Sequence, residues 1–199
     1  APGANKPMDA APIHPLRLCD EIKNFMKRDA ILCVDGQEIL NYGRQSMPTF
    51  VPGHRLNSGP FGTMGVGLPF GIGAKIAKPD KQVIVVHGDG SFGMNALELD
   101  TAVRHNVPVL VVVSLNGGWT ADPDGNKPGR NLGYTRFDKM AETLGCYGEY
   151  VEQPADIRPA LDRAQREVDR GAVALVNVRT DHRARAGTGD DHGRRREGQ

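Results

Sequence analysis

The sequence predicts an α/β domain in which a parallel β-sheet is flanked by helices on both faces. Two observations support this prediction. Helix-like and strand-like segments alternate along the chain. The strand-like segments are short, continuously apolar runs, such as PVLVVVSL at 108–115. Strands have this composition when helices cover both faces of a parallel sheet.

The individual elements follow from apolar spacing and from turn residues. Helices are predicted at 15–28, 65–77, 91–105, 136–144 and 154–170. The second of these is apolar almost all round and is expected to be buried. Strands are predicted at 30–34, 82–86, 108–115, 147–151 and 172–178. Residues 116–133 are rich in Gly, Pro, Asp and Asn and are predicted to form a long loop.

The length of 199 residues suits one sizeable domain, expected at 15–180. Residues 1–14 are expected to be a linker, and 181–199 a polar tail or active-site flap. The net charge of +1 gives no reason to invoke nucleic acid or membrane. No apolar run approaches the length of a membrane span, and the start lacks a signal core. Three cysteines without CxxC spacing suggest reduced, buried thiols in a cytoplasmic protein.

Two glycine-rich turns stand out. Gly88-Asp89-Gly90-Ser91 follows the strand predicted at 82–86, and Asn116-Gly117-Gly118 follows the next strand along the chain. The carboxyl ends of parallel strands share one edge of the sheet, where ligands bind. Asp89 and Asn116 are therefore expected to meet at one point.

These two turns offer the carboxylate oxygen of Asp89, which is charged, and the amide oxygen of Asn116, which is neutral. Such hard oxygen ligands suit Mg²⁺ or Ca²⁺ better than zinc. One aspartate binds Mg²⁺ weakly, so phosphate oxygens are expected as further ligands. The prediction is a Mg²⁺-bridged diphosphate, and the alternative is a plain turn at Gly88-Asp89-Gly90. No GxxxxGK[ST] motif occurs, and GTMGVGLPFGIG at 62–73 fits a dinucleotide fingerprint poorly.

GDGS, with an Asn twenty-seven residues after the Asp, resembles the thiamin-diphosphate motif of the decarboxylase and acetohydroxyacid synthase superfamily. The block NSGPFGTMGVGLPFGIGAKIAKPDKQVIVVHGDGS is similar to the one that precedes the motif in those enzymes. The resemblance implies the pyrophosphate-binding domain, normally the C-terminal third of a longer, oligomeric enzyme. It also implies that the glutamate activating the cofactor lies on a pyrimidine-binding domain, usually of a neighbouring subunit.

The resemblance also implies roles for individual residues. Mg²⁺ would be held by Asp89, Asn116 and the carbonyl of Gly118. The diphosphate would be approached by the backbone of Gly88, Gly90 and Ser91 and by the Ser91 hydroxyl. The stretch VDGQEIL at 34–40 would form a loop near the diphosphate, with Gln37 as a weaker candidate. Met64 would lie under the cofactor and force its two rings into a V, or would simply pack in the core. The carbonyl of Gly62 and the N–H of Met64 would bind the aminopyrimidine.

The segment SLNGGWTADPDGNKPGRNLGYTRFDKMAETLG most resembles 2-hydroxyacyl-CoA lyases and oxalyl-CoA decarboxylase. Trp119 is then a candidate for the wall of the substrate pocket, and the alternative is a place in the hydrophobic core. Asp122 is a candidate acid–base group, and the alternative is a turn residue before Pro123. Arginines of the C-terminal segment would meet the phosphates of CoA, or would belong to a solvated tail. These arginines are Arg183, Arg185, Arg194, Arg195 and Arg196. His182 and His192 are expected to be bystanders.

The function that this resemblance implies is cleavage of a 2-hydroxyacyl-CoA to an aldehyde or ketone plus formyl-CoA. One alternative is condensation of 2-oxoacids, as in acetohydroxyacid synthase. Another is a cofactor-binding or assembly module without catalysis.

Overall fold

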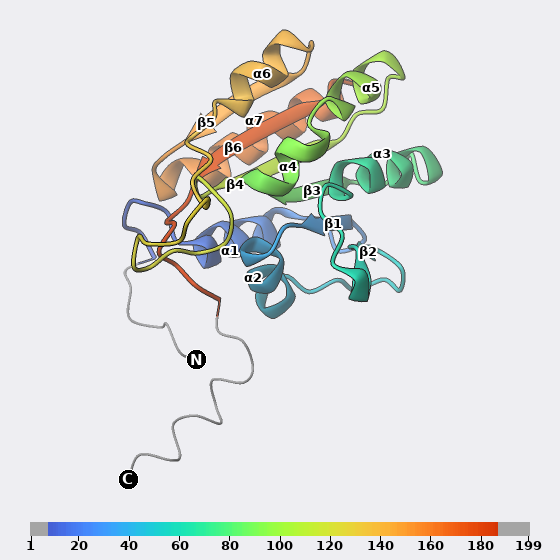
Figure 1. Ribbon diagram of the computed structural model, residues 1–199. Helices are drawn as coiled ribbons and strands as arrows, with labels where there is room; N and C mark the ends of the chain where they lie inside the picture. The colour runs from blue at the N-terminus through green and yellow to red at the C-terminus, as the bar shows by residue number, and fades with distance from the viewer. Residues whose placement is uncertain (1–7, 187–199) are drawn as a thin grey trace.

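Six parallel strands form the centre of the computed structural model, which describes residues 8–186 (Figure 1). Their order across the sheet is β2-β1-β3-β4-β6-β5, and every neighbouring pair is parallel. The strands are β1 Ile31–Asp35, β2 Arg55–Leu56, β3 Val83–Gly88, β4 Leu110–Leu115, β5 Tyr147–Val151 and β6 Ala174–Arg179. The predicted parallel sheet is confirmed, and β2 is a short edge strand that the apolar pattern did not reveal.

Helices cover both faces of the sheet, as predicted (Figure 1). One face carries α1 Pro15–Phe25, α2 Glu38–Ser46 and α7 Ile157–Asp169. The other carries α3 Gly67–Ala77, α4 Asp89–Asn95, α5 Glu98–Arg104 and α6 Phe137–Thr143. Two short 3₁₀ turns, η1 Gly59–Phe61 and η2 Pro154–Asp156, complete the described elements. The central strands are buried from both sides, which explains their continuous Val, Ile and Leu runs.

Two predicted helices differ from the structure, and a third helix was missed. The single helix expected at 91–105 is two helices, α4 and α5, which meet at Ala96 and Leu97. The helix expected to be wholly buried at 65–77 begins at Gly67 and exposes Phe70 and Ile76. Helix α2 was not predicted, although Ile39, Leu40 and Tyr42 form its buried side.

Both ends of the described chain pack near the carboxyl edge of the sheet. Ile13, in the expected linker, is fully buried and forms an isolated parallel bridge with Thr180. After β6 the chain continues past the same edge, where Ala186 N donates to Glu38 Oε2 (2.9 Å). Residues 13–14 and 180–186 therefore belong to the folded domain, while Arg194, Arg195, Arg196 and His192 lie outside the described residues.

The three cysteines are free and buried, as predicted. Burial raises the pKa of each thiol, which keeps it protonated and unreactive at neutral pH. Within residues 8–186, no helix has the length and apolar character needed to cross a membrane.

Candidate functional site

The two predicted turns meet at the carboxyl edge of the sheet. Asp89 begins α4 directly after β3, and Asn116 directly follows the neighbouring strand β4. Both residues line one small hollow of about 50 Å³. Of the residues proposed from the sequence, those lining this hollow are Gln37, Met64, Gly88, Asp89, Gly90, Ser91, Asn116, Gly118 and Trp119. The topology thus brings together residues that lie far apart in the sequence.

Asp89 is a buried carboxylate with one unsatisfied oxygen. The residue is 4% exposed, and its Oδ1 accepts a hydrogen bond from the N–H of Gly90 (3.0 Å). Among residues 8–186, the buried Oδ2 has no hydrogen-bond partner. Burial raises the pKa of Asp89 to about 6, although the N–H groups of Gly90, Gly117 and Gly118 and the charge of Arg130 oppose this rise. An unpaired buried oxygen of this kind fits a cation ligand.

The second turn is folded tightly by its own glycines. Gly117 has a left-handed φ of 77°, and a Cβ at this position would lie 3.0 Å from the ring of Tyr134, so a side chain here would be strained and would push on that ring. The N–H of Gly118 donates to Asn116 Oδ1 (3.2 Å). Arg130, 5% exposed, donates to the carbonyls of Asn116 (2.9 Å) and Thr120 (3.1 Å). The end of the long loop therefore returns to brace the turn.

Trp119 separates two hollows. A Cβ on Gly90 would lie 2.6 Å from the Trp119 ring, so the indole rests directly on that glycine. Trp119 lines the small hollow and also a second one of 360 Å³, whose wall includes Met94, Leu132 and Phe137. Asp89 and Gly90 line both hollows as well. The indole thus forms a wall between the two hollows, beside the predicted diphosphate turn, and its role as a substrate wall stays a prediction.

Beneath the first turn lies a buried polar cluster that the sequence reasoning missed. Asp35 ends β1 and is the register partner of His87 on β3. His87 Nδ1 lies 3.7 Å from Asp35 Oδ2 and 3.0 Å from the hydroxyl of Ser91. Burial lowers the pKa of His87 to about 4, against the opposing pull of Asp35, so the imidazole is neutral at neutral pH.

The other predicted residues fall away from the small hollow. Gly62 is exposed, with a left-handed φ of 63°, and does not line it. Asp122 accepts from the N–H groups of Asn126 and Lys127, as a turn residue would, and lines neither hollow. Arg183 pairs with Asp181 (Nε to Oδ1, 3.0 Å), and Arg185 is exposed.

Further residues of the site had weak sequence signals. Gly36, Glu38 and Ile39 at the start of α2 line the small hollow, as does Ser114 on β4. The stretch 34–40 was expected near the diphosphate as a loop, so the first three were not singled out as site residues. The acidic Glu38 followed by buried Ile39 and Leu40 was the available signal for a helix start.

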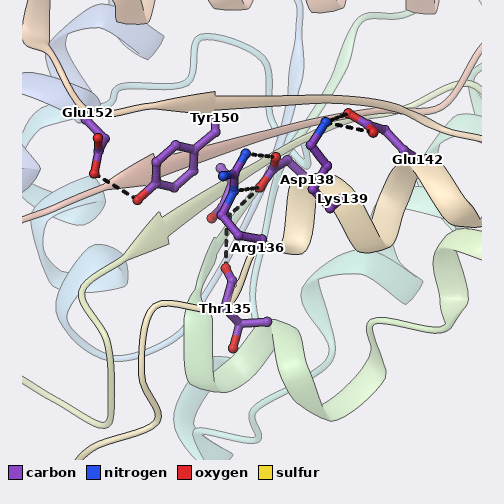
Figure 2. A network of polar contacts seen from close by, with 8 residues as sticks. Thr135, Arg136, Asp138, Lys139, Glu142, Tyr150 and Glu152 are labelled. Atoms are coloured by element: carbon purple, nitrogen blue, oxygen red, sulfur yellow. Dashed lines mark hydrogen bonds and ion pairs between the residues drawn. The ribbon is translucent and has the colours of Figure 1, made fainter.

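The segment after the long loop is fixed to the sheet by a polar network (Figure 2). Arg136 forms two hydrogen bonds with the buried carboxylate of Asp138 (2.9 and 2.6 Å) and lies over the ring of Tyr150. Asn177 on β6 donates to the carbonyl of Thr135 (3.0 Å) and to Asp138 Oδ1 (3.3 Å). This anchor holds the chain just after Tyr134, the residue whose ring covers Gly117.

Comparisons with known proteins agree with this geometry. The sequence model of the family described as "Thiamine pyrophosphate enzyme, C-terminal TPP binding domain" matches residues 40–178. A probable acetolactate synthase of Mycobacterium bovis is 39% identical over 183 residues, which cover 87% of this chain and 32% of that protein. Human 2-hydroxyacyl-CoA lyase 2 is 34% identical over 182 residues, or 86% of this chain and 29% of that protein.

A solved structure has the same fold. The thiamine diphosphate-dependent 4-hydroxybenzoylformate decarboxylase of Rhodococcus jostii RHA1 matches with a TM-score of 0.77 and 27% identity, over 86% of this chain and 33% of that one. The chain therefore spans about a third of the length of each of these relatives. With its matching sequence model, its parallel sheet and its two turns at one sheet edge, the chain belongs to the family of C-terminal TPP-binding domains of thiamine pyrophosphate enzymes.

Proposed function

We propose that this domain binds the diphosphate of thiamin diphosphate through Mg²⁺. The protein ligands of the metal would be the Asp89 carboxylate, the Asn116 amide oxygen and the Gly118 carbonyl. The observation that carries this proposal is the unpaired, buried Oδ2 of Asp89 in a hollow shared with Asn116 and Gly118. A metal ion in that hollow would satisfy the oxygen, and one carboxylate with two neutral oxygens leaves positions for phosphate oxygens.

The residues around the metal turn would seat the rest of the cofactor. Gln37, Gly88 and Gly90 line the small hollow and would contact the diphosphate. Met64 lines the same hollow and would support the rings. When bound, the cofactor supplies an electron sink for carbon–carbon bond cleavage next to a carbonyl. The proposed partner is a pyrimidine-binding domain that carries the activating glutamate, within an oligomer of the whole protein.

For the whole protein we propose a lyase that cleaves a 2-hydroxyacyl-CoA to an aldehyde or ketone plus formyl-CoA. The similarity to 2-hydroxyacyl-CoA lyase 2 supports this activity. Exposed Arg185 would meet CoA phosphates more readily than Arg183, which is paired with Asp181. A second candidate is condensation of 2-oxoacids, favoured by the 39% identity to the mycobacterial acetolactate synthase.

Calorimetric titration of thiamin diphosphate into the purified whole protein tests the cofactor proposal. Binding is expected with Mg²⁺ and is expected to be lost with EDTA. Asp89→Asn should weaken binding at least a hundredfold. The matched control, Asp124→Asn, makes the same change at an exposed loop position and should bind like the parent. Equal binding by both variants would contradict the role given to Asp89.

Product analysis separates the two candidate activities. The loaded protein is incubated with a 2-hydroxyacyl-CoA or with pyruvate, and the products are identified by mass spectrometry. Formyl-CoA from the first substrate supports the lyase. Acetolactate from pyruvate, with no formyl-CoA, would replace the lyase with the 2-oxoacid carboligase.

A further inference from the structure

The buried cluster of Asp35, His87 and Ser91 suggests how the GDGS turn is held in shape. The three side chains come from the end of β1, the end of β3 and the first turn of α4. Their exposed fractions are 3%, 1% and 0%. Because they are cut off from water, their donors need acceptors within the protein.

Asp35 has both carboxylate oxygens occupied by backbone donors. Oδ1 accepts from the N–H of Gly36 (2.6 Å), and Oδ2 accepts from the N–H of Gly67 (2.9 Å), the first residue of α3. A Cβ on Gly67 would lie 2.8 Å from both the Asp35 Cβ and the His87 ring. Asp35 therefore fixes the start of α3 against the end of β3.

The hydrogen atoms in this cluster can be assigned from donor and acceptor chemistry. The Ser91 hydroxyl lies 3.0 Å from the carbonyl of Gly88, which can only accept. Its one hydrogen therefore goes to that carbonyl, and His87 Nδ1, also 3.0 Å away, must donate to the hydroxyl oxygen. Nδ1 also lies 3.7 Å from Asp35 Oδ2, so this tautomer places a positively polarised N–H, and not a lone pair, near that carboxylate.

The opposite tautomer is less favourable. His87 Nε2 is buried beside Gly67 and has no hydrogen-bond partner in the part of the chain that the structure describes. A proton there would be a buried donor without an acceptor, and the lone pair of Nδ1 would face a carboxylate. Leaving a buried donor unpaired is costly, so the proton belongs on Nδ1.

We propose that Asp35 and His87 are positioning residues that hold the Ser91 hydroxyl inward, so that this hydroxyl shapes the turn and is not a ligand of the diphosphate. With its hydrogen given to Gly88, the Ser91 oxygen can only accept, and phosphate oxygens also only accept. Ser91 would then contact the diphosphate only through its backbone. The inference rests on the proposed cofactor site and revises the expectation that the Ser91 hydroxyl contacts the diphosphate.

Two measurements on the whole protein test the inference: the denaturant midpoint without Mg²⁺ or cofactor, and the Kd for thiamin diphosphate with Mg²⁺. Ser91→Ala is expected to lower the midpoint, because it removes two buried hydrogen bonds, and to change the Kd less than threefold. A tenfold or greater loss of affinity with an unchanged midpoint would show that the hydroxyl is a ligand and would overturn the inference.

Two replacements of His87 with similar size isolate its donor. His87→Asn retains an N–H near the position of Nδ1, whereas His87→Leu has none. Asparagine is expected to keep the midpoint close to that of the parent, and leucine to lower it, because leucine removes the donor to the Ser91 oxygen. Ser91→Ala should then lower the midpoint less in the leucine variant than in the parent, since only the bond to the Gly88 carbonyl is left to lose. Equal midpoints for the two His87 variants, or an undiminished effect of Ser91→Ala, would refute the positioning role.

The outcomes separate the two proposals. If the parent protein binds no thiamin diphosphate, the proposed function fails, while the order of the midpoints still tests the hydrogen bonds of the cluster. If the parent binds and only the order of the variants is wrong, the positioning role fails and the cofactor site stands.

Discussion

Asp89 and Asp138 are both buried, and we expect replacement by asparagine to shift the free energy of unfolding in opposite directions. Their side chains are 4% and 1% exposed. Burial raises the pKa of Asp89 to about 6. Burial also acts to raise the pKa of Asp138, but hydrogen bonds from Arg136 and Asn177 outweigh it and hold that pKa below its ordinary value (Figure 2).

The magnitude for Asp89 follows from linkage. A carboxyl with a folded pKa near 6 and an ordinary unfolded value costs about 3 kcal/mol of stability when ionised at pH 7. Asparagine removes that charge but weakens the bond from the Gly90 N–H, a loss of about 1 kcal/mol. Without metal, Asp89→Asn should therefore stabilise the fold by about 2 kcal/mol.

We expect Asp138→Asn to lower the free energy of unfolding, because this carboxylate is paired with Arg136. The change leaves the Arg136 guanidinium without its partner and should destabilise the fold by about 2 kcal/mol, an amount limited by the half-exposed position of Arg136. Asp89→Asn would thus remove metal binding and raise the free energy of unfolding of the metal-free protein. This is expected of a functional residue whose charge lowers the stability of the fold.

Urea unfolding at pH 7.5 in EDTA, followed by circular dichroism and Trp119 fluorescence, measures both changes. The advantage of Asp89→Asn should disappear as the pH falls from about 6 to 4, because the raised pKa lets the folded parent take up its proton first. If Asp89→Asn destabilises the fold as much as Asp138→Asn, then Asp89 carries no strained charge and the reasoning is refuted.

Three further predictions test the site. The affinity for Mg²⁺ should fall about tenfold for each pH unit below about 6, because a proton competes with the metal for the Asp89 carboxylate. Calorimetric titration of Mg²⁺ between pH 5 and 8 measures this, and an affinity that does not change with pH would contradict it. Gly117→Ala should weaken Mg²⁺-dependent binding at least tenfold in calorimetry, because its φ is 77° and a Cβ would lie 3.0 Å from Tyr134. Gly90→Ala should displace the Trp119 indole and red-shift its fluorescence, and an unshifted spectrum would contradict the stacking.

The sequence was sufficient to locate the sheet and the two turns. Continuous apolar runs identify strands such as β3 and β4, and the parallel topology then places Asp89 and Asn116 at one edge. Helix α2 escaped because the stretch that follows Asp35-Gly36 resembles a loop, and its Gly43 interrupts the apolar pattern. Its first residues, which line the small hollow, were missed with it.

Contacts across long sequence separations could not be read from local patterns. Arg130 reaches back to Asn116 only because the loop of 116–133 folds onto its own start. The hydroxyl of Ser91 turns inward only because His87 and Gly88 lie beside it in the folded chain. In both cases the residue type was visible in the sequence, but the partner that decides its role was not.

Asp35 and Asp89 show how such partners separate structure from function. Each is an aspartate followed by a glycine at the carboxyl end of neighbouring strands, so the Asp-Gly pair by itself does not distinguish them. The start of α3 brings the N–H of Gly67 to Asp35, and both of its oxygens are then satisfied. Within residues 8–186, no donor forms a hydrogen bond with Oδ2 of Asp89, although the N–H groups of Gly117 and Gly118 lie near enough to oppose the rise of its pKa. A buried carboxylate that the fold leaves half-paired keeps an open position for a cation, whereas one with both oxygens paired serves as a brace.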